Sequence, residues 1–156
     1  MRVKAYNEPS LISSIGNENY LLRWDVKKDN EVYSYEECII KNPTINEIKE
    51  LIINYYNKQC GLEIVQGFYF EGNQVWLTTE NTFNYKAAAD LAYQTNGTSL
   101  PTTFKFGTTG TPVYRVFKEV EDLQNFHVKF ISYIDTTLKK YREIKDNIDW
   151  NKYELE

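Results

Sequence analysis

Residues 68–97 have the sequence FYFEGNQVWLTTENTFNYKAAADLAYQTNG, which passes from alternating apolar residues to an alanine-rich run. The first part indicates a β-hairpin that turns at Gly72-Asn73, because turn-forming residues there separate two apolar segments. The apolar faces of this hairpin consist of Phe68, Phe70, Val75 and Leu77. The spacing then becomes helical, so the sequence predicts a hairpin followed directly by a helix.

The polar cluster TTEN separates the hairpin from the helix. Thr79 or Asn81 is suited to be the N-cap, and Glu80 is favourable near the positive end of the helix dipole. Asn96-Gly97 is the predicted end of the helix. The predicted packing face consists of Tyr85, Ala88, Ala89 and Ala92, with Phe83, Ala87 and Leu91 beside it. We therefore interpret the cluster as a helix start in preference to a polar functional site.

The same order of elements is predicted on both sides of this segment. The runs YLLRWDVK and VYSYEECII form a hairpin before a helix in which Thr44 and Glu47 make a capping box and Gly61 is the stop. A third hairpin, TTFKFG and PVYRVFK around the loop GTTGT, precedes the longest helix, which begins near Glu121. No residue-level repeat accompanies this order.

The predicted fold class is therefore α+β, with three β-hairpins each followed by a helix (ββα-ββα-ββα) and antiparallel sheet packed by the helices. Residues 19–146 are predicted to form a single domain, because 156 residues suit one domain. Residues 1–18 lack sustained periodicity and are interpreted as an N-terminal arm or lead-in. Residues 147–156 are interpreted as a C-terminal tail.

Composition excludes several functional classes. The formal net charge is −4, whereas nucleic-acid binders usually carry a basic face, so no nucleic-acid partner is expected. No apolar run is long enough to span a membrane, and the first residues lack the apolar region of a secretory signal. We therefore expect a protein made in a cytoplasm, with no membrane partner and with Cys38 and Cys60 as reduced thiols.

No combination of residues predicts a catalytic or cofactor site. The apolar stripe of the last helix consists of Leu123, His127, Phe130, Ile134, Leu138 and Tyr141. The single histidine, His127, thus lies on this stripe, and its sequence neighbours offer no orienting carboxylate. We interpret it as a core residue. Cys38 and Cys60 have apolar or helical surroundings, which raise a thiol pKa and so disfavour a nucleophile. With one His and two separated Cys, no zinc spacing exists, and no cofactor is expected.

Two motifs remain as weak alternatives. The GTTGT loop joins two strands and has no lysine where a phosphate-binding loop needs one, so we interpret it as a hairpin loop. Three acidic groups become glycosidase candidates only if two carboxylates face each other across a cleft of about 5–9 Å. These groups are Glu36-Glu37, Glu119-Glu121-Asp122 and Asp146-Asp149.

The aromatic content indicates a further use of side chains. The chain has 13 Tyr, 8 Phe and 3 Trp, and a small core does not easily satisfy so many tyrosine hydroxyls. Some tyrosines are therefore expected at the surface, where Tyr and Trp favour protein interfaces and sugar stacking. The candidate partner-interface residues at the two chain ends are Tyr6, Leu11, Ile12, Ile15, Trp150, Tyr153 and Leu155. The alternative is that both ends pack back on the domain.

Several motifs in the second half of the chain occur together. The first consists of Trp76, Leu77, Thr79, Glu80, Asn81, Phe83, Asn84, Tyr85, Lys86, Ala87 and Ala88. The next consist of Leu100, Pro101, Thr103, Phe104, Lys105, Phe106, Gly107, Glu121, Asp122, Leu123, Ile148, Asp149 and Trp150. Together they are similar to a domain of unknown function found in tail and fibre proteins of tailed phages of gut bacteria, including crAss-like phages, and the resemblance covers roughly residues 40–153. It departs at His127, where family members tend to have tyrosine.

The resemblance implies a non-enzymatic virion structural protein, a head or tail fibre or fibre-anchor subunit. Its expected partners are other phage virion proteins and further copies of itself, and its expected location is the virion after synthesis in the host cytoplasm. Two alternatives stay open. One is an assembly chaperone absent from the mature particle, and the other is a carbohydrate-binding module that recognises the host.

Overall fold

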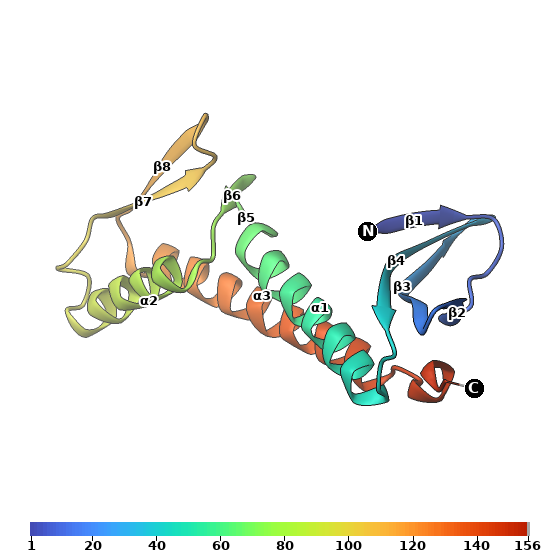
Figure 1. Ribbon diagram of the computed structural model, residues 1–156. Helices are drawn as coiled ribbons and strands as arrows, with labels where there is room; N and C mark the ends of the chain where they lie inside the picture. The colour runs from blue at the N-terminus through green and yellow to red at the C-terminus, as the bar shows by residue number, and fades with distance from the viewer. Residues whose placement is uncertain (156) are drawn as a thin grey trace. The chain divides into compact units, whose positions relative to one another are not determined.

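The computed structural model describes residues 1–155 (Figure 1). The first elements are β1 (Arg2–Ala5), β2 (Ile12–Gly16), β3 (Asn19–Asp29), β4 (Val32–Lys41), α1 (Ile45–Gln66), β5 (Phe68–Phe70) and β6 (Asn73–Val75). The remaining elements are α2 (Thr79–Gln94), β7 (Thr102–Gly107), β8 (Pro112–Phe117), α3 (Val120–Asp146) and the 3-10 helix η1 (Trp150–Tyr153). The predicted α+β class with antiparallel sheet is confirmed, but the order of strands differs from the prediction.

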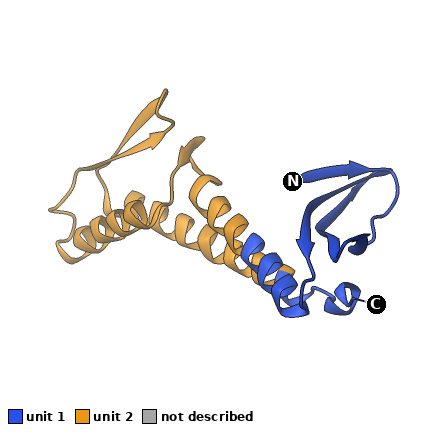
Figure 2. Cartoon of the chain, in the orientation of Figure 1, with its two compact units in different colours: residues 1–56, 145–156 blue, residues 57–144 orange. Residues whose placement is uncertain are grey.

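The chain divides into two compact units, which Figure 2 shows in blue and orange. Unit 1 consists of residues 1–56 and 145–156, and unit 2 consists of residues 57–144. The sequence predicted a single domain over residues 19–146 instead. The difference arises because the chain has two separate groups of buried side chains, and α1 and α3 each contribute residues to both units.

Unit 1 contains a four-stranded antiparallel sheet in the order β1-β4-β3-β2. Residues 1–18, predicted to be an arm, contribute its two edge strands. Val3 of β1 lies opposite Tyr35 of β4, and Ile12 of β2 lies opposite Leu22 of β3. The predicted β3–β4 hairpin would otherwise leave two edges of unpaired N–H and C=O groups, and β1 and β2 satisfy those groups.

The helix α1 begins as predicted. The Glu47 carboxylate accepts a hydrogen bond from the Thr44 backbone N–H at 2.7 Å, and the Thr44 hydroxyl accepts one from the Glu47 N–H at 3.3 Å. The predicted stop at Gly61 is wrong, because the helix continues to Gln66. An exposed glycine costs a helix only about 1 kcal/mol, and Ile64 beyond it packs against the core of unit 2.

One face of the unit 1 sheet packs against the first part of α1. Leu22 and Trp24 of β3 are buried, as are Ile48 and Ile52 of the helix. The Trp24 ring meets the Tyr55 ring edge-on, with centroids 5.6 Å apart. The apolar face that alternates along β3 therefore packs against the apolar face of α1.

The C-terminal residues of unit 1 form an ordered turn of helix. Asp149 is the N-cap of η1, and its carboxylate accepts a hydrogen bond from the Asn151 N–H at 3.2 Å. Tyr153 is buried, and its hydroxyl donates a hydrogen bond to the Arg23 carbonyl oxygen at 3.2 Å. Residues 147–156, predicted to be a tail, therefore include part of the unit 1 core.

Unit 2 contains the other two hairpins. β5 pairs with β6, and β7 pairs with β8, both antiparallel as predicted. The first turn lies one residue earlier than Gly72-Asn73, because Glu71 and Gly72 hold the two positive φ values of 49° and 79°. Two successive positive φ values match the right-handed twist of the strands that they join.

The start of α2 confirms that the TTEN cluster begins a helix, although the capping residue differs. The N-cap is Thr78 and not Thr79 or Asn81. The Thr78 hydroxyl accepts a hydrogen bond from the Asn81 N–H at 3.1 Å. The Asn81 amide donates in turn to the Trp76 carbonyl oxygen at 2.8 Å, which ties the helix start to the end of the hairpin.

The core of unit 2 is aromatic and is centred on Phe126 of α3, which has no exposed surface. Its fully or nearly fully buried members are Phe68, Phe70, Val75, Leu77, Tyr85, Ala92, Phe106, Phe117, Leu123, Phe126 and Phe130. They come from both hairpins and from α2 and α3. The core thus holds these four elements in fixed mutual positions.

Glu63 of α1 joins the helices α1 and α3 within unit 2. Its carboxylate accepts hydrogen bonds from Lys140 Nζ at 2.8 Å and from the Tyr141 hydroxyl at 2.8 Å. The Lys140 ammonium, more than any other group, lowers the pKa of the Glu63 carboxyl below its usual 4.5, and the Tyr141 hydroxyl lowers it further. The charged form of Glu63 is therefore the form that the fold stabilises.

We expect Glu63→Gln to reduce the pH dependence of stability. Because the pKa of Glu63 is lower in the folded than in the unfolded chain, its carboxylate stabilises the fold above about pH 4.5. That contribution is lost as the pH falls through the folded-state pKa. Urea unfolding should show a loss below about 1 kcal/mol for the variant at neutral pH, and a smaller difference from wild type in acid. Equal differences at both pH values would contradict this account.

Candidate interaction surfaces

The four N-terminal residues predicted to contact a partner all lie in unit 1 and differ in exposure. Tyr6 and Ile15 are accessible, with 81% and 50% of their surfaces exposed. Leu11 and Ile12 are half-buried, and the Leu11 carbonyl oxygen accepts a hydrogen bond from the Arg23 N–H at 2.7 Å. Tyr6 and Ile15 are therefore the residues of this group that a partner can reach.

The three C-terminal candidates are less accessible. Tyr153 is only 5% exposed, so its predicted role as an interface residue does not fit its place in the unit 1 core. Trp150 is half-buried, with Lys49 Nζ 5.7 Å from the centre of its ring. Leu155 is partly exposed. For this end of the chain, the alternative that it packs back on its own domain accounts for two of the three residues.

The helix α2 presents an apolar face to the solvent. Phe83 is 71% exposed, Leu91 is 52% exposed, and Ala87 lies exposed between them. The three residues are four positions apart, so they follow one another along the same side of the helix. We call this row the α2 stripe. Among the described helical residues of unit 2, Phe83 is the most exposed aromatic side chain, followed by Tyr93 on another side of α2 at 67%.

The α2 stripe lies away from the face that packs against the core. Tyr85 and Ala92 are the buried residues of α2, and they occur about half a helical turn from Phe83 and Ala87. The sequence placed Phe83, Ala87 and Leu91 beside the packing face without assigning them a role. Because these three residues are spaced four positions apart, they form a second apolar face of the helix and do not merely widen the packing face.

Charged and polar residues border the α2 stripe. Lys86 Nζ contacts the Asp90 carboxylate at 2.6 Å across one turn of the helix, and both side chains are about half exposed. Glu80 lies exposed in the first turn of the helix, and Gln94 lies exposed in the last. The stripe is thus apolar along its middle and polar at its edges, as in the interfaces of proteins that associate.

The hairpins of unit 2 add a second accessible surface. Tyr69 of β5 is 60% exposed and Tyr114 of β8 is 65% exposed. Both belong to the strand face opposite to the buried phenylalanines, since successive residues of a strand point to opposite sides. Val116, on the same face as Tyr114, is also partly exposed. Two of the 13 tyrosines are therefore exposed on these strands, as the sequence led us to expect for some of them.

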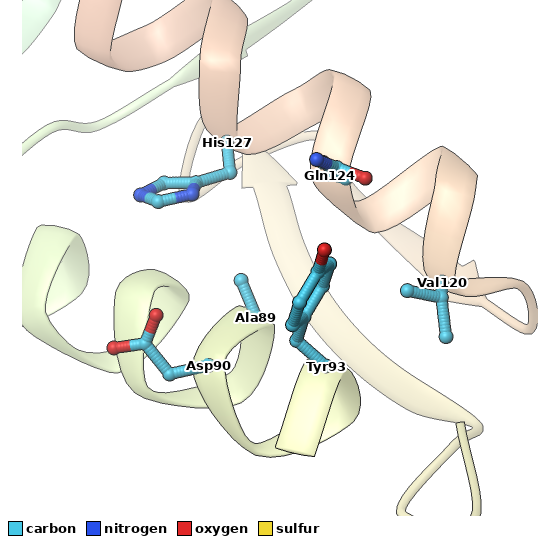
Figure 3. A pocket seen from close by; sticks show the side chains of 6 residues that line it. All are labelled: Ala89, Asp90, Tyr93, Val120, Gln124 and His127. Atoms are coloured by element: carbon cyan, nitrogen blue, oxygen red, sulfur yellow. The ribbon is translucent and has the colours of Figure 1, made fainter. Parts of the chain in front are cut away.

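His127 lies half-buried between α2 and α3 and lines a small cavity of about 90 Å³ (Figure 3). The other lining residues are Ala89, Asp90, Tyr93, Val120 and Gln124. The His127 ring lies 5.1 Å from the Phe130 ring, and among the described residues its Nε2 atom has no hydrogen-bond partner. The sequence predicted a core residue, whereas His127 is half-buried and lies outside the group of fully buried side chains.

The two cysteines lie on different elements. Cys38 belongs to β4 and is half-buried, and Cys60 belongs to α1 and is buried. Burial raises the pKa of the Cys38 thiol, as the sequence predicted from its apolar neighbours. A raised thiol pKa lowers the fraction of thiolate at neutral pH, which disfavours a nucleophilic role.

The predicted acidic pair Glu36-Glu37 does not form a facing pair of carboxylates. The two residues are successive in β4, so their side chains point to opposite faces of the sheet. Glu37 accepts a hydrogen bond from Arg23 Nε at 2.7 Å, and Glu36 accepts a long one from Arg2 at 3.4 Å. Each of the two carboxylates is therefore hydrogen-bonded to a different arginine.

The other acidic groups have structural contacts of the same kind. Asp122 lies 3.9 Å from Arg115, and Asp149 caps η1. A separate acidic residue, Asp25, accepts a hydrogen bond from Arg2 at 2.7 Å and from the Tyr55 hydroxyl at 3.4 Å. Burial, and then the nearby Asp25 carboxylate, raise the pKa of Tyr55 to about 12.

Residues 1–155 contain neither a cluster of metal-ligating side chains nor a helix that could span a membrane. No three His, Cys, Asp or Glu side chains in this part of the chain are close enough together to hold a metal ion. Within the same residues, the helices are too short or too polar to cross a membrane.

Comparison of the chain with protein-family models, with curated proteins and with solved structures gave no match.

Proposed function

We propose that this chain is a non-enzymatic structural protein of a bacteriophage virion, a subunit of a head or tail fibre or of its anchor. It acts by binding other virion proteins and further copies of itself. The phage assignment is supported by the motifs that resemble a domain of phage tail and fibre proteins. The mode of action is supported by the surface of unit 2.

The α2 stripe is the observation that carries the proposed mode of action. Burying apolar surface is favourable by about 25 cal/mol per Å², so an exposed Phe83 and Leu91 on one helix face gain free energy when a partner covers them. Single exposed apolar residues are common, but a row with polar borders is typical of protein interfaces. The accessible Tyr6 and Ile15 in unit 1 offer further contacts.

Mass spectrometry of purified virions tests the proposal. A fibre or anchor subunit made in the host cytoplasm should be present in the finished particle in stoichiometric amounts relative to known structural proteins. Peptides present in infected cells but absent from purified particles would instead support the assembly chaperone. Absence from both particles and assembly intermediates would overturn the virion assignment altogether.

A glycan-binding module is the second candidate, and the exposed Tyr69 and Tyr114 favour it. Accessible aromatic rings are the groups on which sugar rings stack. A glycan array measures this activity directly. Binding that is lost in Tyr69→Ala or Tyr114→Ala, while the virion association persists, would add host recognition to the structural role.

A further inference from the structure

Four exposed residues of α2 lie in two pairs at equal distances from Ala87. Phe83 lies four residues before it and Leu91 four residues after it. Glu80 and Gln94 lie seven residues before and after it, at the two ends of the row. All five side chains are exposed on the same side of the helix. A helix face with this symmetry is complementary to itself when a second copy runs in the opposite direction.

We propose that the α2 stripe binds the α2 stripe of a second copy of this chain, with the two helices antiparallel and Ala87 on the twofold axis. A helix rises about 1.5 Å per residue, so Phe83 and Leu91 lie about 6 Å on either side of Ala87. Phe83 of each copy then lies opposite Leu91 of the other. This is an isologous contact, in which the same surface is used by both subunits.

The charged residues at the border select the antiparallel direction. Glu80 lies opposite Gln94 of the second copy, and its carboxylate can accept a hydrogen bond from that amide. Lys86 and Asp90 contact each other at 2.6 Å within one copy. In the antiparallel pair, Lys86 of one copy and Asp90 of the other are only about 3 Å apart along the helix axis. Each Lys86 therefore reaches Asp90 of the other copy. In a parallel pair, the two Glu80 carboxylates would face each other, and Lys86 and Asp90 of the two copies would lie at opposite edges of the contact, where they could not pair.

The small side chain of Ala87 permits the close approach that this packing needs. Two helices pack with their axes 8–10 Å apart, and a small residue at the crossing point favours the shorter distance. The large Phe83 and the medium-sized Leu91 then fill the space on both sides of the crossing. A bulky residue at position 87 would hold the two rows apart.

This contact rests on the proposed self-assembly and specifies how two copies pack against each other. The contact of two single helices is smaller than a standard protein interface, so we expect a dimer that dissociates on dilution. Within a fibre or an anchor, contacts at other surfaces would act together with this one and strengthen it.

A charge-exchange experiment tests the antiparallel arrangement. Lys86→Glu makes both border positions acidic, and Asp90→Lys makes both basic, so each variant alone should repel its own copy. Sedimentation equilibrium should show the dissociation constant of each variant raised about tenfold or more. An equimolar mixture of the two should recover dimers, because an acidic border then faces a basic one. Both positions are exposed, so circular dichroism should remain unchanged.

A second set of variants tests the apolar contact without the charges. Phe83→Glu combined with Leu91→Glu should abolish the dimer at concentrations where wild type associates. Val128→Glu is the matched control, since Val128 is a 56% exposed apolar residue on a different helix, α3. The control should dimerise as wild type does.

The outcomes separate this inference from the proposed function. A chain that associates equally with and without the α2 substitutions would overturn the α2 contact and leave the self-assembling virion subunit in place. A wild-type chain that stays monomeric at every accessible concentration would also overturn the contact. The virion assignment is decided independently by the mass spectrometry of particles, whatever the result for α2.

Discussion

Replacing Phe126 by alanine is expected to lower the free energy of unfolding by about 3–5 kcal/mol. Phe126 is completely buried in unit 2, and a smaller side chain leaves a cavity that the surrounding rings can only partly fill. Its ring centroid lies 5.0–6.4 Å from those of Phe68, Phe70, Tyr85, Phe104, Phe106, Phe117 and Phe130. Urea unfolding followed by circular dichroism measures the effect.

Phe83→Ala is the matched control for this prediction. The same change of side chain is made, but Phe83 is 71% exposed, so the loss should be within about 0.5 kcal/mol. A similar loss for both variants would mean that the aromatic cluster does not hold unit 2 together. Phe126→Leu should recover part of the loss, because leucine refills some of the volume.

The central position of Phe126 illustrates a limit of periodic patterns. The sequence placed Leu123, His127 and Phe130 on the apolar stripe of the last helix, and of these Leu123 and Phe130 are fully buried. Phe126 was not assigned to that stripe. Positions 123, 126, 127 and 130 all satisfy helical spacing, and only the hairpins that pack on α3 decide which of them is innermost.

Local chemistry accounts for what the sequence predicted correctly. The capping box of Thr44 and Glu47 and the polar residues before α2 act within one helical turn, so they are visible in a single segment. The third hairpin was recognisable because its two strands are joined by a short glycine-containing loop. In each of these cases the interacting groups are near neighbours in the chain.

Pairing between distant residues accounts for what the sequence missed. β1 pairs with β4 although Val3 and Tyr35 are far apart in the chain, and its four residues are too few to show a reliable alternation. Tyr153 was predicted to be an interface residue, but it is buried and its hydroxyl donates a hydrogen bond to the Arg23 carbonyl oxygen. Neither contact has a signature within its own segment.

The candidate surface on α2 was partly visible in the sequence. Phe83, Ala87 and Leu91 follow one another at four-residue intervals, but Ala88, Ala89 and Ala92 give the helix a second small apolar face. With two such faces, periodicity alone cannot say which one meets the core. The burial of Tyr85 and Ala92 decides it and leaves the larger side chains on the outside.

Gly107→Ala is expected to lower the free energy of unfolding by about 2–5 kcal/mol. Gly107 has a φ of +81°, a left-handed conformation that costs other residues about 1–2 kcal/mol. A Cβ there would also collide with the Thr111 carbonyl oxygen, and such overpacking costs about 1–3 kcal/mol. Because the contacting atom belongs to the backbone of the β7–β8 loop, the hairpin itself must shift to relieve the collision.

Gly72→Ala separates the two contributions to this loss. Gly72 has nearly the same φ, +79°, but a Cβ there would meet nothing within 4 Å. Its loss in urea unfolding should therefore be the conformational cost alone, about 1–2 kcal/mol. The additional loss at Gly107 measures the cost of the close approach of the Thr111 carbonyl oxygen.

Because the Gly107 carbonyl oxygen accepts a hydrogen bond from Trp76 Nε1 at 3.0 Å, Gly107→Ala should also alter tryptophan fluorescence, whereas Gly72→Ala should not. Equal losses and unchanged fluorescence in both variants would show that the loop adjusts freely, and that the β7–β8 hairpin is not fixed by this contact.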